Sequence, residues 1–292
     1  MAAEKENFPI KMMARLLGVS RQGFYQWLAR GPEADPWAEL KAAIEEAWLA
    51  SERIFGARQI LHSLPAHFSG TTLYRIRKCM HELGICGIVP HKAKKTTIPD
   101  EDAPKRPDLV RRDFTSPVPT YKLVGDITYL RTGEGWLYLA TVIDLCTRMV
   151  VGWSLSERMT ADIVVSALEM ARGRGYVADG AIFHSDRGSQ YASKILARWA
   201  KAHGVRLSVG RTGSCHDNAV AESFFGSLKN EWYSRFSFKT RARAKTAVIW
   251  YIESFYNRMR PHSSVGWRKP AELMGEFFAR SADNCGEVMK AA

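Results

Sequence analysis

The sequence predicts a mixed α/β domain, preceded by a helical region and followed by a basic helical tail. Six of the twelve prolines fall within residues 90–119, a segment rich in proline and charge that separates a helical first third from the rest of the chain. After this segment the apolar period becomes that of β-strands, and later strands alternate with helices. This order of elements predicts a mixed sheet with hairpins first and helical crossovers later.

The composition favours a nucleic-acid partner. The 292 residues are 46% hydrophobic and 25% charged, as in ordinary globular proteins, but the net charge is +12. The most apolar run, residues 137–146, is too short to span a bilayer, and the N-terminus has no secretory signal pattern. Five scattered cysteines suit reduced thiols better than disulfides. We therefore expect no membrane segment and a cytoplasmic location.

Two helix–turn–helix-like units are predicted before the linker. In the first, Gly18 marks the turn and Ser20 is expected to cap the following helix. In the second, residues 69–71 make the break and Gly84 ends the helix.

The helix of the second unit has two different faces. The apolar side consists of Leu73, Ile76, Met80 and Leu83, and the basic side of Arg75, Arg77 and Lys78. An apolar face for a partner helix and a basic face for the groove suit a DNA-reading helix. An ordinary helical hairpin with a solvated face is the alternative, and these residues alone leave both open.

The central region is predicted to alternate between strands and helices. Strands are expected over residues 120–130, 135–144, 148–157, 181–186 and 206–210, with a hairpin turn at 133–135. Helices are expected over 160–175, beginning at Thr160, and over 193–204. This is the element order of ribonuclease-H-like domains.

Two acids occupy unusual places in these strands. Asp126 lies within the first strand, and Asp186 ends the fourth. A carboxylate is costly to bury without a partner, and ligands usually bind at strand ends of open α/β sheets. Two such acids suit a divalent, oxygen-preferring metal. Alternatively each acid stabilises a turn, as Asp186 would before Gly188.

Asp144 ends the second strand and is expected to pair with Arg148 across a turn.

A third acid lies in the predicted helix of residues 217–232. Its apolar face consists of Val220, Ala221, Phe224, Leu228 and Trp232. Glu222 and Lys229 share another face, because seven residues make nearly two turns. Asp217 is expected to begin the helix, with Asn218 as the alternative.

The segment 235–270 carries nine Lys or Arg residues and one acid, Glu253. We expect its charges to face DNA. Five apolar and aromatic residues have helical spacing and are expected to pack against the sheet: Val248, Tyr251, Ile252, Phe255 and Tyr256.

With these residues in view, the chain resembles the catalytic subunit of insertion-sequence transposases of the DDE class, within the retroviral integrase superfamily. It resembles in particular the OrfB-type chain of the insertion sequence 3 family. The similar motifs are GDITYLRT, HSDRGSQYAS, DNAVAESFFGSLK and YNRMRPHSSVGWRKPAEL, with FGARQI in the N-terminal region. Asp186 and Glu222 are separated by the 35 residues 187–221, a spacing that this branch shares with retroviral integrases. Together and in order, these motifs make a specific match.

The resemblance implies the site and its chemistry. Asp126, Asp186 and Glu222 would be the catalytic residues and would hold two divalent cations, Mg²⁺ or alternatively Mn²⁺. The residues implied to bind DNA are Lys229, Arg187, Arg75, Arg77 and Lys78. The implied reaction is metal-dependent DNA strand cleavage and strand transfer during transposition. Two alternatives are a ribonuclease-H-like nuclease and an inactive, sequence-specific DNA-binding relic.

The resemblance also implies partners. The DNA partners would be the ends of the insertion sequence and the target. An upstream subunit with a helix–turn–helix and a leucine zipper would join by frameshift fusion or association. A homo-oligomer on DNA and a place at the bacterial nucleoid are expected.

The predicted domains are a helical DNA-binding region at 1–89, a proline-rich linker at 90–118, an integrase-type, ribonuclease-H-like catalytic core at 119–235 and a basic helical region at 236–292. A zinc site in the first region is disfavoured. His62, His67, Cys79 and Cys86 lack the short Cys–Cys spacing that tetrahedral zinc sites use.

Overall fold

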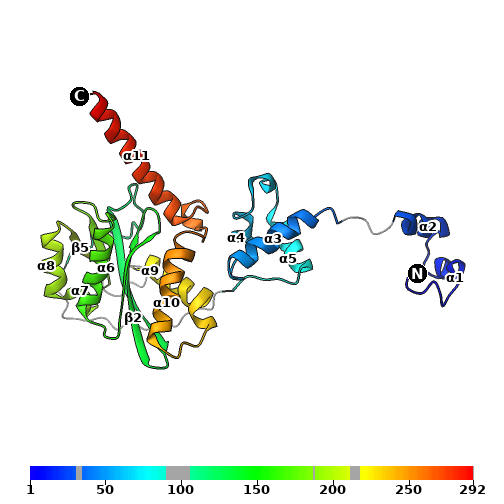
Figure 1. The fold of residues 1–292 in the computed structure, drawn as a ribbon, viewed down its shortest axis with the longest axis horizontal. Helices are drawn as coiled ribbons and strands as arrows, with labels where there is room; N and C mark the ends of the chain where they lie inside the picture. The colour runs from blue at the N-terminus through cyan, green and yellow to red at the C-terminus, as the bar shows by residue number, and fades with distance from the viewer. Residues whose placement is uncertain (31–34, 90–105, 187, 211–217, 292) are drawn as a thin grey trace.

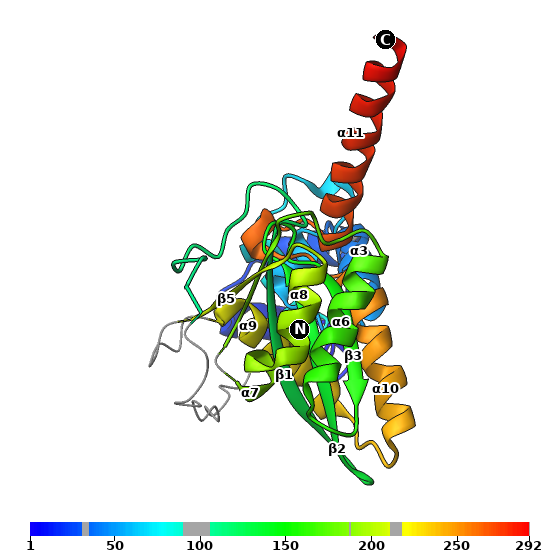
Figure 2. The same cartoon turned by 90° about the vertical axis from the view of Figure 1, so that its left-hand side faces the viewer.

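The computed structural model describes residues 1–30, 35–89, 106–186, 188–210 and 218–291. A five-stranded sheet with helices on both faces forms the largest part (Figure 1). The helices α1 to α5 precede this part, and the long helix α11 (Pro270–Ala291) projects away from it (Figures 1 and 2).

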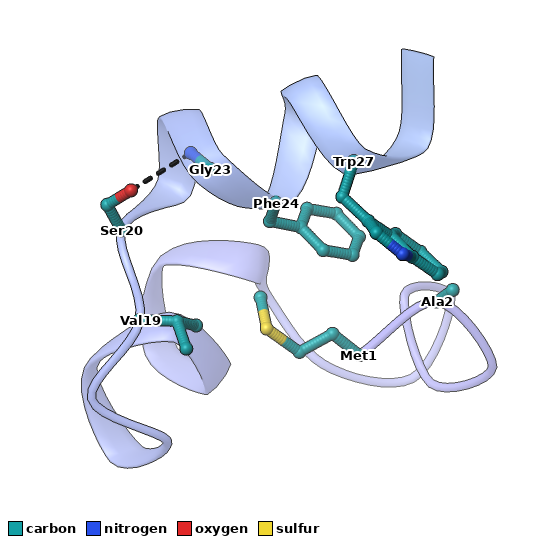
Figure 3. Close-up of a pocket in the computed structure, with 7 residues that line it drawn as sticks. All are labelled: Met1, Ala2, Val19, Ser20, Gly23, Phe24 and Trp27. Carbon is teal, nitrogen blue, oxygen red and sulfur yellow. Dashed lines mark hydrogen bonds between the residues drawn. The ribbon is translucent and has the colours of Figure 1, made fainter. Parts of the chain in front are cut away.

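The first helical pair consists of α1 (Ile10–Leu16) and α2 (Arg21–Arg30). Gly18 lies between them with a φ of +66°, which favours glycine, and the Ser20 hydroxyl accepts a hydrogen bond of 2.9 Å from the Gly23 N–H (Figure 3). The predicted turn and cap are thus confirmed. A shallow pocket lies between this pair and the N-terminus and is lined by Met1, Ala2, Val19, Ser20, Gly23, Phe24 and Trp27 (Figure 3).

The second unit consists of α3 (Ala38–Ala50), α4 (Ala57–Leu61), the 3₁₀ turn η1 (Ala66–Phe68) and α5 (Leu73–Glu82). Thr72 caps α5 by accepting a hydrogen bond of 3.3 Å from the Arg75 N–H, just after the predicted break. Gly84 follows the helix with a φ of +66°. Ile76 and Met80 are buried, as the apolar face predicts.

The sheet consists of β1 (Lys122–Thr132), β2 (Gly135–Asp144), β3 (Val150–Ser156), β4 (Ile182–Ser185) and β5 (Arg206–Val209). Their spatial order is β3-β2-β1-β4-β5. The first three strands pair antiparallel, whereas β4 pairs parallel with both β1 and β5. The predicted order of hairpins followed by crossovers is therefore confirmed.

Two layers of helices cover the sheet. One face packs against α6 (Ala161–Gly173), α7 (Ser189–Ala192) and α8 (Lys194–Ala202). The other packs against α9 (Ala219–Ser227) and α10 (Arg241–Trp250). Gly125 allows close packing inside β1, because a Cβ there would lie 2.3 Å from the Phe183 ring.

The helices after β5 contain two π-helical turns, η2 (Leu228–Trp232) and η4 (Tyr251–Tyr256). The 3₁₀ turns η3 (Tyr233–Arg235) and η5 (Ser263–Val265) complete this region. The five residues predicted to pack by helical spacing are all buried: Val248, Tyr251, Ile252, Phe255 and Tyr256.

The charges of this region only partly face solvent. Arg260 forms a buried ion pair of 2.6 Å with Glu231 instead of facing DNA, and the Tyr251 hydroxyl donates to the same carboxylate at 2.8 Å. Arg241 pairs with Glu157 at 3.0 Å. The prediction that the charges of 235–270 face DNA was wrong for Arg260, because its guanidinium is largely buried against Glu231.

The second helical unit packs against the C-terminal region. The Phe55 and Phe255 rings lie 5.7 Å apart, and the Arg235 guanidinium donates to the Glu52 carbonyl at 2.8 Å. His62 stacks on Trp267 at 4.6 Å. These contacts join the unit to the helices beside the sheet in one hydrophobic core.

The predicted ion pair between Asp144 and Arg148 is absent. The buried Asp144 carboxylate instead accepts hydrogen bonds from the Thr120 N–H at 2.8 Å and from the Thr147 N–H and hydroxyl at 2.7 Å. Nearby N–H groups and a hydroxyl therefore satisfy this acid, and the Arg148 guanidinium donates to the Phe114 carbonyl at 2.9 Å.

Among the described residues, no helix has the length and apolar character that a membrane span requires.

Candidate active site

Asp126 and Asp186 lie at the same level of two neighbouring strands. β1 and β4 run parallel, and Val124 is paired with His184. Each acid is two residues beyond that pair, Asp126 within β1 and Asp186 directly after β4. Residues at the same level of neighbouring parallel strands lie side by side, and ligands of open α/β sheets bind near the carboxyl ends of such strands. The convergence predicted for these two acids is therefore present.

The surroundings of Asp126 raise its pKa to about 8. Burial is the largest cause, and the negative charges of Asp186 and Glu222 add to it. The Ile127 N–H donates to the carboxylate at 2.8 Å and, together with the Lys229 charge, acts in the opposite direction. Two acids and one lysine thus act on the Asp126 carboxyl.

Asp186 both forms a turn and belongs to this acidic group. Its Oδ1 accepts a hydrogen bond of 3.0 Å from the Gly188 N–H, the Asx-type contact expected as the alternative. Burial raises the pKa of Asp186, and this hydrogen bond opposes the rise. The buried Tyr191 hydroxyl is close enough to the acids that, after burial, the charges of Asp126 and Asp186 raise its pKa.

The helix α9 carries Glu222 to the same place. It begins at Ala219 with Asn218, the alternative, at its N-cap position, and Asp217, which was expected to begin the helix, lies outside the described residues. The Asn218 amide does not cap the helix but donates to the Gly125 carbonyl at 3.3 Å, beside Asp126. Its Oδ1 is buried without a hydrogen-bond partner. Glu222 is exposed one turn further on.

Lys229 reaches the site from a π-helical turn rather than from a regular helix. The predicted shared face of Glu222 and Lys229 assumed an α-helix, which ends at Ser227 before η2. The two side chains do not form an ion pair, yet both act on Asp126. The Lys229 Nζ lies 5.0 Å from the centre of the Tyr129 ring. Burial lowers the pKa of Lys229, and the Asp126 charge opposes this.

The other residues predicted to bind DNA lie elsewhere. Arg187 is outside the described residues. Arg75 and Lys78, on α5, lie over the Trp37 ring at 5.5 and 4.5 Å. Arg77 is exposed on the same helix. These three basic residues belong to the second helical unit and not to the acidic group.

The acidic group suits a divalent cation. Burial raises the pKa of Asp126, and repulsion by the negative charges of Asp186 and Glu222 raises it further. A bound cation would relieve that repulsion. Asn218, whose amide nitrogen donates to the carbonyl of the residue before Asp126, also carries a buried Oδ1 without a hydrogen-bond partner. Within the described part of the chain, however, no three metal-binding side chains form a ready ligand set. The sheet therefore brings two acids together, with Glu222 nearby on α9.

Sequence reasoning did not single out Tyr129, Tyr191 or Asn218 as parts of the site. Tyr129 is three residues after Asp126 in the same strand, and Asn218 is one helical turn before Glu222. The helical spacing could have suggested that Asn218 lies near Glu222, whereas three residues along a strand place Tyr129 on the opposite face from Asp126. The sequence contains no comparable signal for Tyr191, because its place depends on α7.

A mixed sheet with acids on β1, directly after β4 and on α9 is the arrangement of an integrase-type catalytic core, the class of enzymes that cleave and join DNA strands. The family model "Integrase core domain" matches residues 117–215, and a second model of that description matches 203–270. A model of an HTH-like domain matches residues 36–93, the second helical unit.

Similar proteins identify the family. Transposase InsF for insertion sequence IS3A of Escherichia coli (strain K12) is 37% identical over 277 residues, which cover 94% of this chain and 96% of that protein. An uncharacterized 31 kDa protein of insertion element IS600 from Shigella sonnei is 35% identical over 92% of this chain and its own full length. The chain belongs to the family of IS3-type insertion-sequence transposases, which are DDE enzymes.

Solved structures of retroviral integrases are more distant. The chain is 17% identical to a chain of the simian T-cell lymphotropic virus intasome, with a TM-score of 0.48 over 78% of this chain and 73% of that one. It is 14% identical to the HTLV-2 integrase catalytic core in complex with magnesium, with a TM-score of 0.43 over 54% of this chain and 97% of that one.

Proposed function

We propose that Asp126, Asp186 and Glu222 are the catalytic carboxylates of this transposase and hold two divalent cations, Mg²⁺ or Mn²⁺. The observation that supports this most strongly is the shared level of Asp126 and Asp186 on parallel strands, where burial and then the negative charge of Asp186 raise the pKa of Asp126. Hard carboxylate oxygens suit Mg²⁺, which keeps positions for water and phosphate.

The three acids would hold the cations against the scissile phosphate. When bound, the cations would activate the attacking water or 3′-hydroxyl and stabilise the leaving 3′-oxygen. Lys229 would hold a DNA phosphate beside Asp126, where its charge already acts. Positioning and charge are the main contributions a protein makes to phosphoryl transfer, so no covalent protein nucleophile is needed.

The DNA partners would be the ends of the element and its target. The exposed Arg77, with Arg75 and Lys78 beside it on α5, would contact DNA from the helix–turn–helix-like unit. An upstream helix–turn–helix and zipper subunit would supply further end recognition, and the active form would be an oligomer on DNA at the bacterial nucleoid.

The metal assignment is tested by calorimetric titration of the full chain with Mn²⁺. Asp126→Asn and Glu222→Gln should each weaken Mn²⁺ binding at least about tenfold. Asp162→Asn, an exposed acid on α6, is the matched control and should bind like the wild type. Wild-type affinity in both site variants would refute the assignment.

A further inference from the structure

Two exposed aromatic side chains lie on one face of the β1–β2 hairpin, next to the acidic group. Tyr129 on β1 is 41% exposed, and Trp136 on β2 is 46% exposed. Their rings meet edge to face with centres 5.1 Å apart. In the register Trp136 lies opposite Arg131, so Tyr129 and Trp136 are diagonal neighbours on the same face of the sheet. We call these two side chains the aromatic platform.

The aromatic platform is held rigidly. The ladder between β1 and β2 continues to Thr132 and Gly135, at the end of the hairpin. Backbone carbonyls on both strands are bound from outside: Arg131 accepts from the Tyr233 hydroxyl at 3.0 Å, and Trp136 accepts from the Arg241 guanidinium at 3.2 Å. The rings therefore need little ordering when they bind a ligand.

Positive charge surrounds the platform. The Lys229 Nζ lies 5.0 Å from the centre of the Tyr129 ring, and Arg131 is exposed opposite Trp136. Such cations beside open aromatic faces are the combination that proteins use for single-stranded nucleic acid, since the cations bind phosphates and the rings stack on bases. Packing within the protein does not explain why two large rings stay exposed here.

Lys229 links the platform to the acidic group, because it lies over Tyr129 and also acts on the Asp126 carboxyl. Tyr129 is three residues from Asp126 along β1, about 10 Å, and strand alternation places the two side chains on opposite faces of the sheet. This distance corresponds to about three nucleotides of one DNA strand. A DNA strand that reaches both would pass around β1 beyond the last residue that pairs with β4. Figure 2 shows the hairpin extending beyond the helices that cover the sheet, so a strand of DNA can approach it.

We propose that the aromatic platform stacks on an unpaired base of the DNA substrate, within about three nucleotides of the scissile phosphate. This rests on the proposed function, which places DNA at the carboxylates. The platform would favour DNA whose strands are separated beside the cleaved position, because a base inside a duplex cannot reach the rings.

The test measures binding in EDTA, so that cleavage does not enter. The probes are a blunt DNA duplex and the same duplex with a short single-stranded overhang that carries 2-aminopurine. The wild type should prefer the overhang, and its fluorescence should be quenched by stacking. Trp136→Ala and Tyr129→Ala should each reduce overhang affinity about tenfold, as expected for one lost stacking contact, and leave blunt-duplex affinity unchanged.

Two further variants keep the result interpretable. Tyr129→Phe retains the ring and should bind like the wild type. Tyr121→Ala removes another exposed tyrosine, which has the Arg206 guanidinium 5.8 Å from its ring centre near the other end of β1, and should also bind like the wild type.

Equal losses for both probes, or no loss for either, would overturn the platform proposal. A change in self-association without a change in overhang binding would show that the rings contact protein instead, and would also overturn it. Failure of the carboxylate assignment is detected separately, because Glu222→Gln abolishes cleavage without changing quenching if both proposals hold.

Discussion

Asp126 and Asp186 are neighbours because β1 and β4 run parallel and each acid lies two residues beyond the paired residues Val124 and His184. Since β4 is only four residues long, Asp186 lies directly after its last residue, at the carboxyl end of the strand. The relation depends on the register of the strands and therefore on packing far from the acids. In the metal-free protein the ionised Asp126 carboxylate is therefore disfavoured, so the free energy of unfolding should depend on pH.

The stability of the metal-free protein should fall as pH rises from about 4 to about 8. The Asp126 pKa is raised from 3.8 to about 8 on folding, so the folded state binds more protons than the unfolded state between these values. Stability from the protonated carboxyl is complete below about 4 and lost above about 8. Thermal unfolding in EDTA across this range measures the slope.

Asp126→Asn should remove most of that slope. At pH 8 the variant should melt higher than the wild type in EDTA, by at least about 2–4 °C, which corresponds to roughly 1 kcal/mol. Asp162→Asn, with its carboxyl exposed on α6, should follow the wild-type curve. An unchanged slope in Asp126→Asn would show that this carboxyl is not the source of the pH dependence.

Lys229→Ala should weaken DNA binding and flatten its salt dependence. If Lys229 binds one phosphate, the slope of log K against log salt should decrease by about 0.7–0.9. Lys201→Ala is the control, because Lys201 is exposed on α8, on the opposite face of the sheet, and its slope should be that of the wild type. A wild-type slope in Lys229→Ala would exclude the phosphate contact.

Glu231→Gln should destabilise the fold strongly. Arg260 donates to both carboxylate oxygens of the buried Glu231 at 2.6 to 3.1 Å, and removal of one charge leaves the largely buried Arg260 guanidinium without its partner. The expected loss is about 3–5 kcal/mol in denaturant unfolding.

The control for that variant is Glu276→Gln, which breaks the exposed pair with Arg268 and should unfold at nearly the same denaturant concentration as the wild type. Similar losses for the two variants would show that the Glu231–Arg260 pair is not specially important. Because Glu231 lies two residues after Lys229 in η2, this pair also holds the turn that positions Lys229.

Much of the fold was predictable because it depends on local patterns. Strand alternation and turn residues predicted β1 to β5 with ends within a few residues, and Gly18 and Gly84 marked the helix ends where only glycine has an easy conformation. The apolar spacing around Val248 and Phe255 predicted their burial.

The features that escaped prediction depend on contacts between distant segments. The helical wheel that joined Glu222 to Lys229 could not foresee the π-helical turn, which is stabilised by packing with residues near 251 and 260. The expected pairing of Asp144 with Arg148 overlooked the nearby N–H groups of Thr120 and Thr147. The charge count of 235–270 likewise could not show that Glu231 lies against Arg260.

Strand transfer by the purified full chain tests directly whether Glu222 is a catalytic carboxylate of this transposase. The chain, supplied with its upstream subunit, is incubated with DNA carrying the element ends, a target plasmid and Mg²⁺. We predict joined products with the wild type and none with Glu222→Gln, although that variant should bind the same DNA with nearly wild-type affinity. Joined products from Glu222→Gln at the wild-type level would contradict the account.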